Sequence, residues 1–200
     1  MSRFAPSVSS MSVLHRSLPT PPEALRVGPF REDAFTSDLH DVRVVARLGR
    51  LLGIAFTVCF LTGLFSHLHQ HEPSWLSLPT RPVQLYRWTQ GVHVTTGIAC
   101  LPLLLAKLWS VYPQLFAWPP AKSIAHGIER ASLFLLVGGS LFQITSGLLN
   151  TAQFYGPMGF NFTVVHYWVG WITMGALALH IGSKVALARA AWALPLDDRA

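Results

Sequence analysis

Two histidines stand in a segment that is otherwise apolar enough for the interior of a lipid bilayer. The segment VVHYWVGWITMGALALHIG covers residues 164–182 and holds His166 and His180 but no Asp, Glu, Lys or Arg. An ionisable side chain inside a membrane is energetically costly, and it marks a candidate functional site. Their spacing of fourteen residues turns an α-helix through about 1400° and rises about 21 Å. Both imidazoles therefore face nearly the same side of one helix, toward opposite leaflets.

Helices must position these side chains, because four segments of the chain are long and apolar enough to cross a bilayer. Hydrophobic residues make up 51% of the chain and charged residues only 12%, whereas soluble domains carry about 25% charged residues. A hydrocarbon core of about 30 Å needs about 20 helical residues. The sequence thus predicts an all-α fold, an integral membrane four-helix bundle. The expected spans are 44–66, 86–109, 123–149 and 162–188.

The basic residues indicate how these helices are oriented. The two loops on one side hold only Arg81 and Arg87, and the other thirteen of the fifteen Lys and Arg residues lie on the opposite side. Cytoplasmic flanks carry the excess of Lys and Arg, so we expect both termini to be cytoplasmic. The same rule explains the net charge of +6 without a nucleic-acid partner. We expect a multi-pass protein of the plasma membrane.

This pattern divides the chain into three regions. Residues 1–40 are rich in Pro, Ser and scattered charges, which is typical of a disordered tail, here cytoplasmic. Residues 41–190 form the four-helix transmembrane domain, and 191–200 form a second, short cytoplasmic tail. Cys59 and Cys100 lie inside apolar spans without a CxxC spacing, so we expect neither a disulfide nor a thiolate metal site.

The membrane depth of each histidine assigns it a partner. His93 and His166 each lie about five residues into a span that enters from the outer side, so both belong to the outer leaflet. His126 begins the third span near the cytoplasm, at the depth where His180 leaves the fourth. The sequence therefore predicts two level pairs, His93 with His166 and His126 with His180.

Paired imidazoles on facing helices are ligands that haem iron takes in helix bundles. Gly97 follows His93 by four residues, and Gly170 follows His166 by four. Each histidine therefore has a glycine, which lacks a side chain, on the same face of its own helix. This leaves the clearance that a flat macrocycle needs. We expect haem b, one or two groups per chain, in a haem-binding domain with these iron ligands: His93, His166, His126 and His180.

A non-redox interpretation stays open beside this one. The same histidines can form polar contacts between helices or relay protons in a membrane anchor or small transporter. Further polar groups on the third span are Gln143, Thr145 and Ser146. This interpretation expects acidic partners within the spans, where the sequence offers only Glu129 at an edge. Haem ligation is the favoured interpretation.

A third group of histidines, HLHQH at residues 67–71, is expected just beyond the first span. Alternate histidines suit a metal site, but only Glu72 adds another ligand beside them. We therefore favour a solvated loop near a quinone or a partner surface.

Three stretches carry a family resemblance: ARLGRLLGIAFTVCFLTGLFSH (46–67), LYRWTQGVHVTTGIACLPLLLAKLW (85–109) and HYWVGWITMGALALHIGSK (166–184). They resemble the four-helix di-haem cytochrome b family, which includes the membrane subunits of formate dehydrogenases and nickel-iron hydrogenases. More closely, they are similar to the membrane anchors of actinobacterial molybdopterin-dependent oxidoreductases of the sulfite-oxidase type. The resemblance covers about residues 28 to 190 of the chain.

The resemblance implies that His93 and His166 bind an outer haem and that His180 binds an inner one. In the family, the partner of the inner ligand lies near the cytoplasmic end of the first span. This chain has RLGRLL there and no histidine. His126 is the substitute at that depth and His40 is a weaker one, and a single-haem protein is the alternative.

The resemblance also implies a function in the respiratory chain. Electrons would pass between the quinone pool and a redox partner on the outer face, a molybdopterin oxidoreductase or similar dehydrogenase. We expect an electron-transfer subunit of an oxidoreductase rather than a complete enzyme, with substrate chemistry in a separate partner. The remaining partner is the membrane lipid itself.

Overall fold

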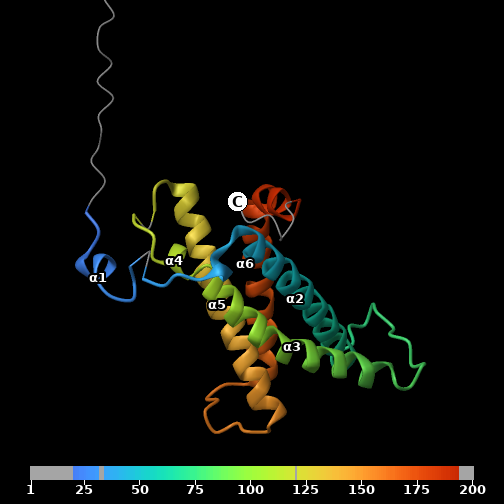
Figure 1. The fold of residues 1–200 in the computed structure, drawn as a ribbon. Helices are drawn as coiled ribbons and strands as arrows, with labels where there is room; N and C mark the ends of the chain where they lie inside the picture. Colours follow the sequence, from blue (N-terminus) through green and yellow to red (C-terminus); the bar gives the residue numbers. More distant parts are fainter. Residues whose placement is uncertain (1–19, 32–33, 120, 194–200) are drawn as a thin grey trace, which may run out of the picture.

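The computed structural model describes residues 20–31, 34–119 and 121–193, and every regular element in these ranges is helical. The predicted all-α fold is therefore confirmed (Figure 1). The elements are α1 (Glu23–Arg26), the 3-10 helix η1 (Asp38–His40), α2 (Val42–Gln70), α3 (Leu85–Ser110), α4 (Tyr112–Leu115), α5 (Ile124–Thr151) and α6 (Phe162–Trp192).

Four of these helices, α2, α3, α5 and α6, are long and apolar enough to cross a membrane, as the sequence predicts. Each is slightly longer than its expected span, because helical hydrogen bonding continues beyond the apolar residues into the interface.

Polar side chains cap three of these four helices at the start. Asp41 accepts from the Arg43 N–H at 2.7 Å, Ser123 from the His126 N–H at 3.1 Å, and Asn161 from the Val164 N–H at 3.2 Å.

The four helices form two antiparallel hairpins. The first hairpin joins α2 to α3 through the loop 71–84, and the second joins α5 to α6 through the loop 152–161. Figure 1 shows the hairpins diverging toward these loops. We call this side of the bundle the loop end and the opposite side the termini end. At the termini end, the Trp192 indole donates to the Ala46 carbonyl at 3.1 Å and ties the two hairpins together.

The core lies in the middle of the bundle and contains side chains from both hairpins. One cluster joins Leu52 and Leu104 of the first hairpin to Ile144 of the second. Another contains Leu136 and Leu177, against which Phe56 packs. Large apolar side chains elsewhere on the long helices point outward, as lipid-facing residues of a membrane bundle do.

The segment before α2 lies against the termini end of the first hairpin. The Tyr112 hydroxyl donates to the Pro29 carbonyl at 2.8 Å, and the ring of Phe35 lies 5.6 Å from that of Trp109. The prediction of a disordered tail over 1–40 falls partly on residues 1–19 and 32–33, which lie outside the described residues, as do 194–200 of the predicted C-terminal tail.

Candidate functional site

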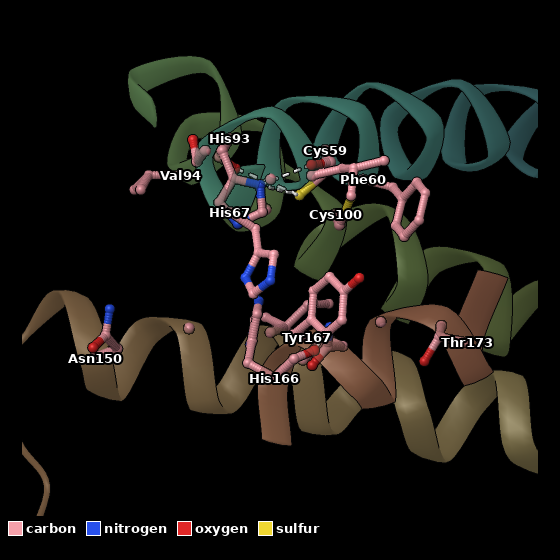
Figure 2. Close-up of a pocket in the computed structure, with 18 of the residues that line it drawn as sticks. Cys59, Phe60, His67, His93, Val94, Cys100, Asn150, His166, Tyr167 and Thr173 are labelled. Carbon is pink, nitrogen blue, oxygen red and sulfur yellow. Dashed lines mark hydrogen bonds between the residues drawn. The ribbon is translucent and has the colours of Figure 1, made fainter. Parts of the chain in front are cut away.

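His93 of α3 and His166 of α6 face each other across the interface between the hairpins. Their ring centroids lie 6.2 Å apart, and their ring planes are nearly perpendicular at 79°. Figure 2 shows His166 extending from its helix toward His93. The two histidines that depth matching pairs on the outer side are thus neighbours in the fold.

A backbone carbonyl fixes the orientation of His93. Its Nδ1 lies 2.7 Å from the carbonyl oxygen of Cys59 on α2, and the Cys59 sulfur lies 3.5 Å from the same nitrogen. A carbonyl oxygen can only accept a hydrogen bond, so we assign the ring proton to Nδ1. The Nε2 lone pair is then free. Histidine ligands of metals are held in this way, with the second nitrogen bonded to a carbonyl or carboxylate.

Gly63 on α2 makes room for the His93 ring. A Cβ at this position would lie 2.6 Å from His93 Cε1 and 2.8 Å from Nδ1, which is closer than such atoms approach. Gly63 stands one helical turn after Cys59 but was not among the residues predicted to line the site. Its role depends on which helix packs beside it, and the sequence alone does not contain that information.

His166 is held by two polar side chains of α5. The Gln143 side-chain amide donates to the His166 carbonyl at 2.9 Å, and His166 Nδ1 lies 3.3 Å from the Ser146 hydroxyl. Because that hydroxyl donates to the Gln143 carbonyl at 3.3 Å, its oxygen is left to accept from Nδ1–H. His166 therefore also presents a free Nε2. Of the three polar residues noted on the third span, Gln143 and Ser146 thus contact this histidine.

A cavity of about 270 Å³ opens between these two rings, just below the range of about 300–1,000 Å³ for ligand pockets. Each membrane helix contributes one glycine to its wall, and the four are Gly63, Gly97, Gly147 and Gly170. The predicted Gly97 and Gly170 thus line the cavity. Their missing Cβ atoms would meet the Cys59 sulfur at 3.6 Å and the Gln143 amide nitrogen at 3.0 Å, not the histidine rings.

These residues fit a haem iron between His93 and His166. Imidazole nitrogens bind metal ions at about 2 Å, so two nitrogens on opposite sides of one ion lie about 4 Å apart. The ring centroids lie about 1 Å behind each nitrogen, which requires a separation of about 6 Å. The observed 6.2 Å meets this requirement.

The predicted inner pair is not brought into contact. Nδ1 of His180 is buried, without a hydrogen-bond partner among the described residues, near the ion pair of Lys184 with Glu129 (2.6 Å). Nδ1 of His126 instead accepts from the Lys122 N–H at 3.2 Å in the first turn of α5. Within the described part of the chain, no ring contact joins His126 to His180. His126 contributes to a helix start.

The remaining candidate ligands form no metal site with one another among the described residues. The ring of His40 lies 6.0 Å from that of Trp109, tilted by 47°, and its Nε2 is buried without a hydrogen-bond partner in the described ranges. The prediction of a loop for HLHQH is wrong for its first four residues, because α2 continues to Gln70. His67 lines the cavity and His69 does not. Among the described residues, no three His, Cys, Asp or Glu side chains form a metal site.

Comparison of the chain with protein-family models, with characterised proteins and with solved structures found no match.

Proposed function

We propose that this protein is a membrane b-type cytochrome that relays electrons through one haem b bound between His93 and His166. The observation that supports this most is the state of the two rings. Each has its Nδ1 bonded to a protein oxygen and its Nε2 free, and the two centroids lie at the separation that one iron requires. When bound, haem b supplies a reversible one-electron couple between ferric and ferrous iron.

The chain's own residues set the conditions for that couple. Hydrogen bonds from Nδ1 raise the basicity of each imidazole and fix its plane, through the Cys59 carbonyl for His93 and the Ser146 hydroxyl for His166. None of the described residues that line the cavity carries a formal charge. A wall without formal charges favours the less charged iron state and influences the redox potential.

The proposed partners follow from the position of the cavity. It lies toward the loop end, which the distribution of Lys and Arg assigns to the outer side. An outer-face oxidoreductase, of the molybdopterin class by the resemblance given above, would exchange electrons there, and membrane quinone would be the other partner. The arrangement of His126 at a helix start favours one haem over two.

Haem content tests this proposal directly. The full-length protein is expressed with ample haem supply, and a pyridine haemochrome assay and a reduced-minus-oxidised spectrum are recorded. We expect one haem per chain, absent from His93→Ala and His166→Ala and retained in the control His126→Ala. Two haems per chain, one of them lost in His126→Ala, would restore the inner pair. Absence of haem from the wild type would favour the non-redox anchor or small transporter.

A further inference from the structure

The cavity has one apolar end and one polar end. Toward the termini end, its two hydroxyl groups are occupied within their own helices. Ser140 donates to the Leu136 carbonyl at 2.6 Å, and Thr173 donates to the Val169 carbonyl at 2.7 Å. The buried polar atom left without a partner among the described residues on this side of His166 is Gln143 Oε1, an amide oxygen that can only accept a hydrogen bond and so does not bind a carboxylate. The apolar part of an amphipathic ligand therefore belongs at this end.

Toward the loop end, the cavity has polar groups that lack partners. The Ser66 hydroxyl is buried, with the residue only 5% exposed, and no described residue bonds to it. The His67 ring nitrogens and the Tyr167 hydroxyl also have no hydrogen bond in the described part of the chain. All three residues line the cavity. Leaving a buried hydroxyl unsatisfied is costly, so this end of the site indicates an oxygen-bearing ligand.

His67 is held with its ring nitrogens available. It follows Gly63 by one turn of α2, so it lies next to the helix face that contacts His93 (Figure 2). Its ring stacks on Tyr167 of α6 at 3.9 Å and on His71 at 4.6 Å, with interplanar angles of 16° and 21°. Rings on both sides fix the plane of the imidazole while its nitrogens stay unbonded.

We infer that His67, with Ser66 and Tyr167, binds the carboxylate-bearing edge of the haem at the loop end of the cavity. This inference rests on the proposed function. Haem b is an apolar macrocycle with two carboxylates on one edge, and the cavity has the same division. No Lys or Arg lines the described cavity, so His67 is the basic side chain at that end, and it can donate a charge-assisted hydrogen bond.

The test compares haem with its dimethyl ester, which has the same macrocycle but no carboxylate. Full-length protein purified without haem is titrated with each form, and the Soret band gives the dissociation constant. We expect the wild type to bind haem about tenfold more tightly than the ester, as a hydrogen bond to a charged group implies. His67→Leu should lose this preference. His67→Gln, which keeps an N–H donor, should retain part of it.

His69→Leu is the matched control, because His69 is on the same helix two residues away, stacks on Tyr86 at 5.1 Å and lies outside this cavity. It should keep the full preference. A wild type that binds both forms equally, or a His67→Leu variant that weakens both equally, would overturn the inference while leaving bis-histidine ligation intact. Failure of both forms to give a six-coordinate spectrum would overturn the proposed function itself.

Discussion

At the scale of single residues, His93 keeps its orientation because Gly63 on α2 has no side chain that would collide with its ring. Gly63→Ala would place a methyl group 2.6 Å from His93 Cε1, so the ring must leave the Cys59 carbonyl. We expect haem affinity to fall about 10- to 100-fold, as for other losses of groups that orient a ligand. Soret titration of the full-length protein measures this.

Gly53→Ala provides the control for that substitution. Gly53 is on the same helix, and a Cβ there would meet nothing within 4 Å. Its haem affinity should equal that of the wild type. If both variants bind haem normally, the close approach of Gly63 to His93 is not required for the site.

At the scale of elements, the start of α2 depends on Asp41. The Arg43 side chain donates to its carboxylate, with Nε–Oδ1 at 3.0 Å and Nη2–Oδ2 at 2.6 Å. These bonds lower the pKa of the Asp41 carboxyl from 3.8 to about 2. Because the folded pKa is lowered, the stabilisation is complete above the ordinary pKa and is lost as the pH falls toward 2.

Amide hydrogen exchange in the first turn of α2 measures this effect. Protection of residues 43–45 should decrease in the wild type as the pH falls from about 4 to about 2. Asp41→Asn keeps a capping acceptor but does not titrate, so its protection should change little over that range. Equal pH dependence in the two proteins would show that another group controls the helix start.

The four helices could be predicted because the length and apolarity of each span are local properties of the sequence. Contacts between helices are not local, so the sequence does not predict them in the same way. Length and apolarity located each span, and Lys and Arg predicted their alternation. Depth along the membrane also paired His93 with His166. Depth does not give the rotation of a helix or the identity of its neighbour, so it did not reveal Gly63 or the place of His67 in the cavity wall. For the same reason, His126 and His180 were predicted at matched depth although their rings are not in contact.

At the scale of the whole molecule, the two hairpins are joined unequally along their length. α2 packs mainly on α3, and α5 packs mainly on α6. At the termini end, the Trp192–Ala46 hydrogen bond joins the hairpins. In the middle of the bundle, the cluster of Leu52, Leu104 and Ile144 joins them again. Toward the loop end they line a cavity and diverge (Figure 1). A ligand bound to His93 on one hairpin and His166 on the other would link them where the protein alone does so least.

Haem should therefore stabilise the bundle against thermal unfolding. A ligand at 100 times its dissociation constant adds about 2.7 kcal/mol to the folded state, which corresponds to about 5–10 °C in Tm for a chain of this size. Scanning calorimetry of the full-length protein, with and without haem at fixed protein concentration, measures the shift. His166→Ala should lose the shift, because one hairpin then has no ligand, and His126→Ala should keep it. A shift that persists in His166→Ala would place the haem elsewhere in the bundle.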